Sequence, residues 1–266
     1  MIKGSRPAWE QQAEAEAQDE RAWGAAASDA PQLVLALRRQ GSREQAWHVR
    51  LLGRAVARRL PGMRVSLACV DRDLPSLSEV MASSTAPSVI VPLWLVGTDR
   101  AQRTLFTASA RSRHSVQIAA ALGPDRLVAD VLAWRLRAAG ARVGDPVVLA
   151  VPAPADPDAH RDVTRAAAML RARWGGAPVA VAYTAGSPRT VDAAVRALRG
   201  TGKRQVAVAP YTLMPGMGAT SVRLQAEQAG AAVVAEPPGM HPLVVELVVR
   251  RHLAATELAR ARTVAA

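Results

Sequence analysis

Five arginines of this 266-residue chain lie in two short segments, and each segment directly follows an apolar run. The first segment spans residues 38–44 and the second spans residues 96–103. An arginine guanidinium binds carboxylates through paired hydrogen bonds, so the two segments together could hold a ligand that carries several carboxylates. Solvated charge at loop and helix positions is the alternative, and it stays open. The candidate ligand-binding residues are Arg38, Arg39, Gly41, Ser42, Arg43, Arg100 and Arg103.

Gly41 and Ser42 allow two interpretations. Ser42 with Gln45 fits a capping box at the start of a helix predicted over residues 43–60, with Gly41 turning the chain before it. A helix N-terminus at this place could equally bind an anion. The pair therefore predicts a capped helix and leaves a ligand contact open.

The elements that must position these residues follow from the alternation of apolar and amphipathic runs. A buried parallel strand is a short continuous apolar run, whereas a surface helix repeats its apolar residues every three to four positions. The predicted strands are 33–38, 65–70, 88–95, 115–121, 147–151, 178–183, 205–210 and 231–235. The predicted helices are 43–60, 100–110, 126–139, 159–173, 188–199, 218–229 and 241–259, with one more that begins at a capping box of Ser76 with Glu79. This alternation predicts an α/β fold with parallel sheets, and ligands of such sheets bind beyond the carboxyl ends of the strands.

Residues 31–140 and 146–259 look like two copies of one unit. Residues 123–130 match residues 239–246, and residues 91–95 match residues 209–213, in the same order and at a similar offset. An internal duplication of this kind predicts two tandem domains, each a four-stranded parallel sheet flanked by helices, with a ligand cleft between them. The expected domains are 31–140 and 146–260, joined by a linker over 140–146. Residues 1–30 are expected to form a flexible N-terminal tail.

Composition narrows the classes of protein. The formal net charge is +12, and only two of its 34 basic residues are lysines, Lys3 and Lys203. The arginines are spread along the chain and no nucleic-acid-binding motif is present, so the sequence does not favour a nucleic-acid partner. Cys69 is the single cysteine, and no run of the sequence is apolar and long enough to cross a bilayer. We therefore expect a cytoplasmic protein without a membrane partner.

Four stretches, taken in order, carry a family resemblance. They are residues 40–44 (Gln-Gly-Ser-Arg-Glu), 73–77 (Asp-Leu-Pro-Ser-Leu), 91–97 (Val-Pro-Leu-Trp-Leu-Val-Gly) and 122–124 (Leu-Gly-Pro). In this order, and with the duplication, the chain resembles the sirohydrochlorin cobalt/ferrochelatase family in its two-repeat, CbiX-like form, over about residues 31–260. The resemblance implies two chelatase-like domains. It also implies a lyase of siroheme or cobalamin biosynthesis that inserts Co²⁺ or Fe²⁺, as substrate, into a sirohydrochlorin-type tetrapyrrole.

The chain departs from the family at the two metal-handling histidines. Gln40 stands at the first position, and Arg100, or Asp99 with a one-residue shift, stands at the second. Metal insertion needs ligands for the ion and a base for the pyrrole protons, and imidazole can serve as both. A glutamine amide is a poor ligand and no base, and a guanidinium repels a cation. The catalytic residues are therefore unknown, and the residues identify no metal site.

The five histidines offer few replacements. His48 and His252 fall inside helices and are interpreted as packing or surface residues. His160 lies beside Asp156 and Asp158, which could be metal ligands or could simply favour a helix N-terminus. His241 belongs to a Gly-x-His-Pro turn that the family shares, where it is not a metal ligand, and His114 has no visible partner.

Two functional hypotheses remain after these observations. One is a sirohydrochlorin-chelatase-like protein, which the order of the motifs favours. The other is a non-catalytic relative that binds a tetrapyrrole or another polyanion as a carrier or regulator, which the replaced histidines and the arginines favour.

Overall fold

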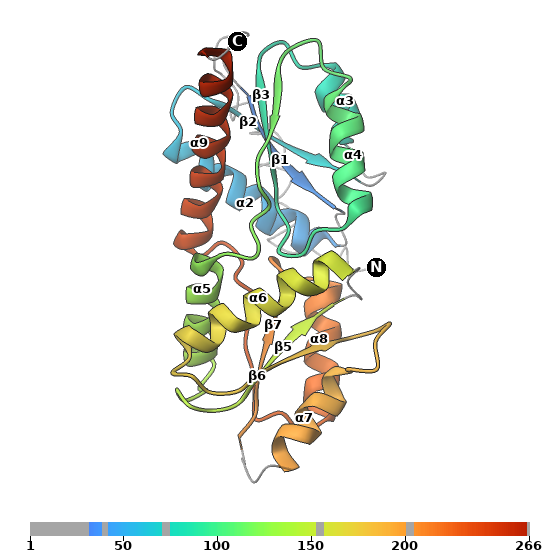
Figure 1. Cartoon of the computed structure of the whole chain (residues 1–266), viewed down its shortest axis with the longest axis vertical. Helices are drawn as coiled ribbons and strands as arrows, with labels where there is room; N and C mark the ends of the chain where they lie inside the picture. Colours follow the sequence, from blue (N-terminus) through green and yellow to red (C-terminus); the bar gives the residue numbers. More distant parts are fainter. Residues whose placement is uncertain (1–31, 39–41, 71–74, 153–156, 201–204, 265–266) are drawn as a thin grey trace, which may run out of the picture.

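Two four-stranded parallel sheets, one in each half of the chain, form the architecture of the protein (Figure 1). The computed structural model describes residues 32–38, 42–70, 75–152, 157–200 and 205–264. The first half contains β1 (Gln32–Leu37), α2 (Arg43–Arg59), β2 (Arg64–Cys69), α3 (Leu77–Ala82), β3 (Ser88–Pro92), α4 (Asp99–Ser109), β4 (Val116–Ile118) and α5 (Arg126–Ala138). The second half contains β5 (Val147–Val151), α6 (Pro157–Arg173), β6 (Val179–Tyr183), α7 (Val191–Gly200), β7 (Ala207–Pro210), α8 (Met217–Gln228), β8 (Val233–Val234) and α9 (Pro242–Val264). The predicted α/β fold with two parallel sheets is confirmed.

The two sheets have the same strand order and the same register. The orders are β2-β1-β3-β4 and β6-β5-β7-β8, so the first strand of each half is central. Ala36 pairs with Pro92 in the first sheet, and Ala150 pairs with Pro210 in the second. Every residue of β1 and β5 is buried, because helices cover both faces of each sheet. The prolines therefore mark equivalent positions, and the next residues, Leu93 and Tyr211, correspond.

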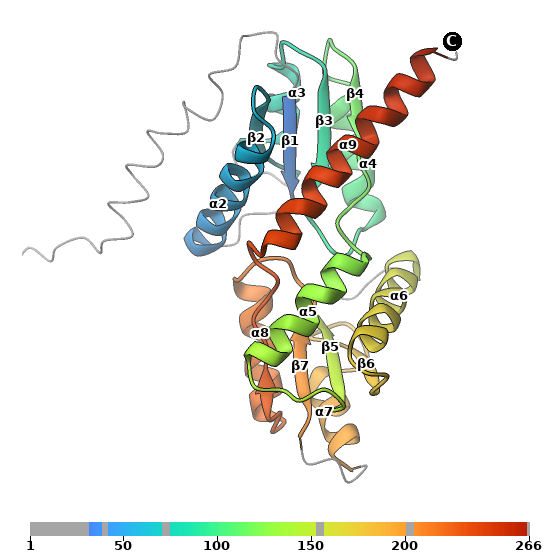
Figure 2. The same cartoon turned by 90° about the vertical axis from the view of Figure 1, so that its left-hand side faces the viewer.

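The last helix of each half covers the sheet of the other half (Figure 2). Helix α5 packs against α6 and β7, whereas α9 packs against α2, β3 and β4. The expected domains, 31–140 and 146–260, describe the repeats along the sequence. In space, the two repeats exchange their last helices.

This exchange joins the two halves through one shared core. Its buried side chains include Leu35 and Val91 of the first sheet, Leu149 of the second, and Leu132 of α5 with Val248 of α9. Burial of a leucine or valine side chain contributes about 1.5–3 kcal/mol, so the exchanged helices hold the halves together by apolar packing. A smaller core lies on the outer face of each sheet. In the part of the chain that the structure describes, no helix has the length and apolarity needed to span a bilayer.

Candidate functional site

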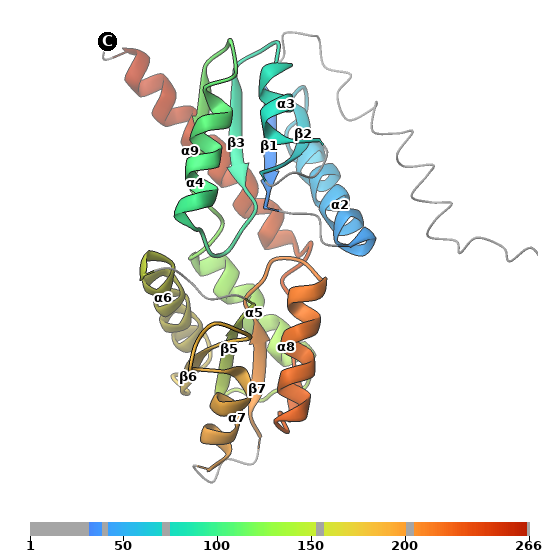
Figure 3. The same ribbon diagram turned by 90° about the vertical axis from the view of Figure 1, so that its right-hand side faces the viewer.

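The carboxyl ends of the two sheets face each other across the middle of the molecule, where the arrows of β3 and β7 point toward one another (Figure 3). A cavity of about 190 Å³ lies between them, and we call it the cleft cavity. Residues that directly follow β1, β3, β5 and β7 line it, together with the first turns of α2. The expected cleft between two parallel sheets is therefore present, and it lies at the edge where sheets of this kind generally bind ligands.

The first half supplies the polar part of the lining. Arg38, Gln45 and Thr98 stand at the cavity beside the apolar residues Leu37, Leu93, Trp94 and Leu95. Thr98 begins α4, because its hydroxyl oxygen accepts the Ala101 amide hydrogen at 3.2 Å. Ser42 begins α2 in the same way, accepting the Gln45 amide at 3.1 Å. The predicted helix start at Ser42 is thus confirmed.

The structure gathers the candidate arginines only in part. Arg38 is exposed and lines the cleft cavity. Arg100 and Arg103 are exposed on α4 and are not among the described residues that line it. Arg39, Gln40 and Gly41 lie outside the described residues, and of Arg43 the structure describes only the backbone, which opens α2. The ligand-binding roles of these residues remain predictions.

The second half supplies a mostly apolar wall. Val151, Pro152, Leu213 and Met214 line the cavity, with Thr212 as a polar exception. Hydrogen bonds hold Pro152, which follows β5, to the residue that follows β6. The Thr184 hydroxyl donates to the Pro152 carbonyl at 2.6 Å. Gln225 of α8 in turn donates its side-chain amide to the Thr184 carbonyl at 3.0 Å.

Tyr211 adds a buried phenol that the sequence patterns did not single out. Its hydroxyl is buried and has no hydrogen-bond partner among the described residues. Burial, reinforced by the negative charges of Asp162 and Asp125, raises the pKa of the Tyr211 phenol far above its ordinary value. The phenol therefore keeps its proton at neutral pH. The sequence signal for this phenol was the presence of Tyr211 at the repeat position where the first half has Leu93.

The imidazole of His160 contacts Tyr183. Its Nδ1 lies 2.9 Å from the hydroxyl of Tyr183, the last residue of β6, and burial raises the pKa of that phenol. Asp156 lies outside the described residues, and the Asp158 side chain is not described either. Within the described ranges, no three His, Cys, Asp or Glu side chains are grouped so that they could hold a metal ion.

The cleft cavity suits binding better than proton transfer. Its described lining consists of apolar side chains, three uncharged polar groups, one guanidinium and a protonated phenol. None of these groups takes up a proton near neutral pH, so none of them is a base for pyrrole N–H groups. Such a lining can bind a planar apolar ligand and can place an anionic group beside Arg38.

The fold consists of two similar α/β halves that face each other across a cleft, and this arrangement resembles that of solved sirohydrochlorin chelatases. The CbiX family model matches residues 154–255, which lie in the second half. SirB from Bacillus subtilis with Fe³⁺ has the same fold, with a TM-score of 0.70 at 15% identity over 85% of this chain and 95% of SirB. The resemblance to the sirohydrochlorin chelatase family that the sequence predicted is confirmed by these matches.

Two further structures agree with this result. SirB from Bacillus subtilis subspecies spizizenii in complex with cobalt gives a TM-score of 0.66 at 16% identity, over 84% of this chain and 93% of that one. CbiX, the terminal enzyme for the biosynthesis of siroheme in denitrifying bacteria, gives 0.61 at 20% identity, over 85% and 99%. No curated protein sequence matches the chain.

Proposed function

We propose that this chain is a sirohydrochlorin-chelatase-like protein that binds a sirohydrochlorin-type tetrapyrrole in the cleft between its two sheets. The observation that carries the proposal is the lining of the cleft cavity, which combines apolar walls from both halves with Arg38. A planar macrocycle presents an apolar face to such walls, and its peripheral carboxylates are suited to pair with guanidinium groups.

The size of the cavity supports a ligand that extends beyond it. Its volume of about 190 Å³ is below the range of roughly 300–1,000 Å³ that is typical of small-molecule sites. A tetrapyrrole would therefore reach out of the cavity toward residues 38–44 and 96–103. Its carboxylates would then meet the arginines of these segments, including those on the exposed side of α4.

Binding without accelerated metal insertion is the form of this function that the residues favour. The described lining of the cleft cavity contains no base and no imidazole, and the sequence places Gln40 and Arg100 at the family's histidine positions. A carrier or regulator needs only the binding step. Insertion of Co²⁺ or Fe²⁺ is the second candidate function, and the order of the family motifs favours it.

Binding of sirohydrochlorin to the purified full chain, followed by its absorbance, tests the proposal. We expect saturable binding that Arg38→Gln weakens about fivefold to tenfold, because a charge-assisted hydrogen bond is lost. Arg59→Gln is the matched control, since Arg59 ends α2 at the opposite edge of the sheet. Failure of sirohydrochlorin to bind, or equal weakening in both variants, would overturn the proposal.

Addition of Co²⁺ to the complex separates the two candidate functions. A rate of insertion equal to the spontaneous rate supports a carrier or regulator, and a rate well above it establishes a chelatase. The double variant Gln40→His with Arg100→His is the companion experiment. We expect it to gain affinity for Co²⁺, because imidazole is a better ligand than an amide or a guanidinium.

A further inference from the structure

Two arginines at equivalent positions hold the exchanged helices in place. Asp125 and His241 correspond in the sequence repeat, and Arg135 of α5 and Arg251 of α9 follow them at the same spacing. Arg251 donates to the Ala121 carbonyl at 3.0 Å, and Arg135 donates to the Pro238 carbonyl at 3.1 Å. Each exchanged helix thus binds the segment that leads into the other one.

The two contacts differ in one component, which is a carboxylate. Asp125 caps α5 by accepting the Leu127 amide at 2.8 Å, and its second oxygen pairs with Arg251 at 2.8 Å. His241 caps α9 through Nδ1, which accepts the Leu243 amide at 3.2 Å, but an imidazole brings no negative charge. The first arginine contact therefore includes an ion pair, and the second includes none with the capping residue.

Arg135 consequently keeps unsatisfied bonding capacity. Its Nε is buried and has no hydrogen-bond partner in the described part of the chain. Glu236 lies nearby, but it forms an ion pair with Arg223 of α8. Burial, and next the charge of Arg135, lower the pKa of His241, so this imidazole is neutral at pH 7. A partly buried guanidinium without an anion is costly, and that cost favours an anion from outside.

A cavity of about 450 Å³ lies at this place, and we call it the Arg135 cavity. Its walls include Trp134, His48, Met240 and Pro237 as well as Arg135, His241 and Glu236, whose carboxylate is already paired with Arg223. The volume falls within the range of roughly 300–1,000 Å³ for small-molecule sites. No described residue lines both this cavity and the cleft cavity, although Met214 and Pro215, which are neighbours in the chain, line one cavity each.

The chemistry of the walls indicates what would fit. Trp134 is 48% exposed, and its ring lies 5.1 Å from that of His241, so the two rings form an aromatic wall. Because His241 Nδ1 accepts the Leu243 amide hydrogen, the neutral ring carries its proton on Nε2 and can donate it. The cavity thus offers a guanidinium, an N–H donor and an aromatic surface together.

We propose that the Arg135 cavity binds a small carboxylate with a planar apolar body. The ligand carboxylate pairs with Arg135, as the Asp125 carboxylate pairs with Arg251 in the other half. The planar body lies against Trp134 and Met240. This proposal rests on the contacts of Arg135 and His241, and it does not require that a tetrapyrrole binds in the cleft.

Benzoate is the probe for the test, and benzamide is its uncharged counterpart of the same shape. Binding to the full chain is followed by tryptophan fluorescence and by the shift of the melting temperature. We expect saturable binding of benzoate, at least tenfold weaker binding of benzamide, and at least a tenfold loss in Arg135→Gln. Arg126→Gln removes the same charge at an exposed position of α5 and is expected to bind benzoate as the wild type does.

His241→Asp supplies the missing carboxylate from within the chain, as Asp125 does in the other half. We expect this variant to melt at a higher temperature than the wild type without ligand, and to bind benzoate at least tenfold more weakly. It stays informative if Arg135→Gln does not fold. The proposal is overturned by absent benzoate binding, by equal binding of benzoate and benzamide, by equal losses in the two arginine variants, or by unchanged benzoate binding in His241→Asp.

Discussion

The two halves of the molecule share a backbone plan and differ in the polar groups placed on it. Leu93, Asp125 and Leu136 of the first half correspond to Tyr211, His241 and His252 of the second. Tyr211 and His252 contribute buried polar atoms without partners among the described residues, whereas two of the first-half counterparts are leucines. The strands and helix starts therefore require a pattern of apolar and capping residues, and individual positions remain free to acquire polar groups.

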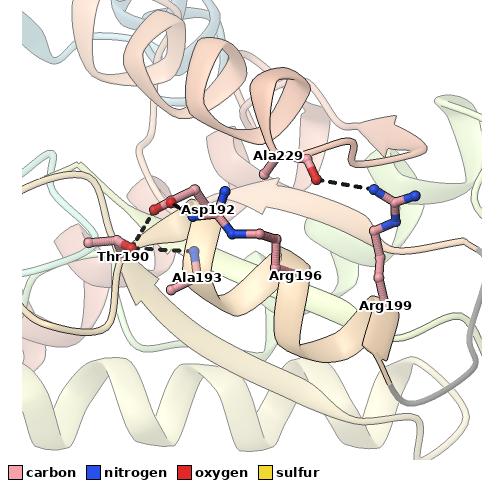
Figure 4. Close-up of polar contacts among 6 residues, drawn as sticks. All are labelled: Thr190, Asp192, Ala193, Arg196, Arg199 and Ala229. Atoms are coloured by element: carbon pink, nitrogen blue, oxygen red, sulfur yellow. Dashed lines mark hydrogen bonds and ion pairs between the residues drawn. The ribbon is translucent and has the colours of Figure 1, made fainter.

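The starts of α3 and α7 also use different polar residues at equivalent positions of the two halves. Ser76 and Thr190 occupy equivalent bridge positions beside Cys69 and Tyr183. Ser76 forms a capping box with Glu79, while Thr190 accepts the Ala193 amide at 3.3 Å and donates to Asp192, which also pairs with Arg196 (Figure 4). Arg199 at the other end of α7 donates to the Ala229 carbonyl at 3.4 Å, which ties this helix to the end of α8. Different side chains thus accept hydrogen bonds from the free N–H groups at the starts of two equivalent helices.

The turns before α5 and α9 provide the largest expected difference between the halves. A Cβ atom at Gly123 would lie 2.2 Å from the Leu95 carbonyl oxygen and 2.7 Å from the Tyr211 hydroxyl. A Cβ at Gly239 would meet nothing nearer than 3.5 Å, although its φ of +61° disfavours other residues. We expect Gly123→Ala to lower the free energy of unfolding by about 3 kcal/mol or more, and Gly239→Ala by about 1–2 kcal/mol.

Urea denaturation of both variants measures this difference. Leu95 also lines the cleft cavity, so Gly123→Ala is expected to weaken tetrapyrrole binding as well. Equal losses of stability in the two variants would show that the two turns are packed alike, contrary to the contacts at Gly123.

Removal of the Asp125 charge gives the next largest effect. Asp125→Asn keeps a capping oxygen for α5 but removes the ion pair with Arg251, whose side chain is only 24% exposed. We expect a loss of about 1–2 kcal/mol in the free energy of unfolding. Arg135→Gln, without ligand, should lose less than half as much, since Arg135 has no ion pair to lose with His241.

Chemical denaturation at low and high salt checks this prediction. The difference between Asp125→Asn and the wild type should shrink at high salt only slightly, because salt screens a partly buried pair weakly. A larger loss in Arg135→Gln than in Asp125→Asn would reverse the comparison and contradict the assignment of the missing carboxylate.

Local patterns in the sequence account for the elements but not for the helix exchange. The strand predicted over 88–95 ends at Pro92 in the structure, and the strand predicted over 231–235 is reduced to Val233–Val234. Apolar residues on α5 and α9 predict a buried face, yet periodicity does not specify which sheet covers it. The duplication makes both sheets suitable partners, so only the tertiary structure shows that each helix crosses to the other half.

The sequence predicted the sheet edge at which the cleft cavity lies, but only some of the residues that line the cavity. A position after β1 brought Arg38 to the cleft cavity, as the rule for parallel sheets requires. Arg100 and Arg103 also follow a strand, but they belong to α4, where successive residues point in different directions around the axis. Thr98, the residue that begins this helix, lines the cavity instead.

His252 gives the smallest effect, and it appears only at acidic pH. The corresponding residue of α5 is Leu136, and His252 is 4% exposed with an unpartnered Nδ1. Burial lowers the pKa of His252, so the folded protein holds a neutral imidazole. The unfolded chain takes up a proton as the pH falls through about 6.5, and the folded chain takes up the same proton only at a lower pH. Stability is therefore complete above about pH 6.5 and is lost as the pH falls below it, by at most about 1.4 kcal/mol per pH unit for this group.

His252→Leu introduces the residue that the first half already has at this position. We expect it to raise the free energy of unfolding at neutral pH, because an unsatisfied nitrogen is replaced by apolar surface, and to reduce the loss between pH 6.5 and 5.5. The remaining pH dependence should come partly from His241, whose pKa is lowered as well. An identical profile in His252→Leu and the wild type would mean that α9 tolerates a charged imidazole where α5 has a leucine, and that the two exchanged helices are packed differently.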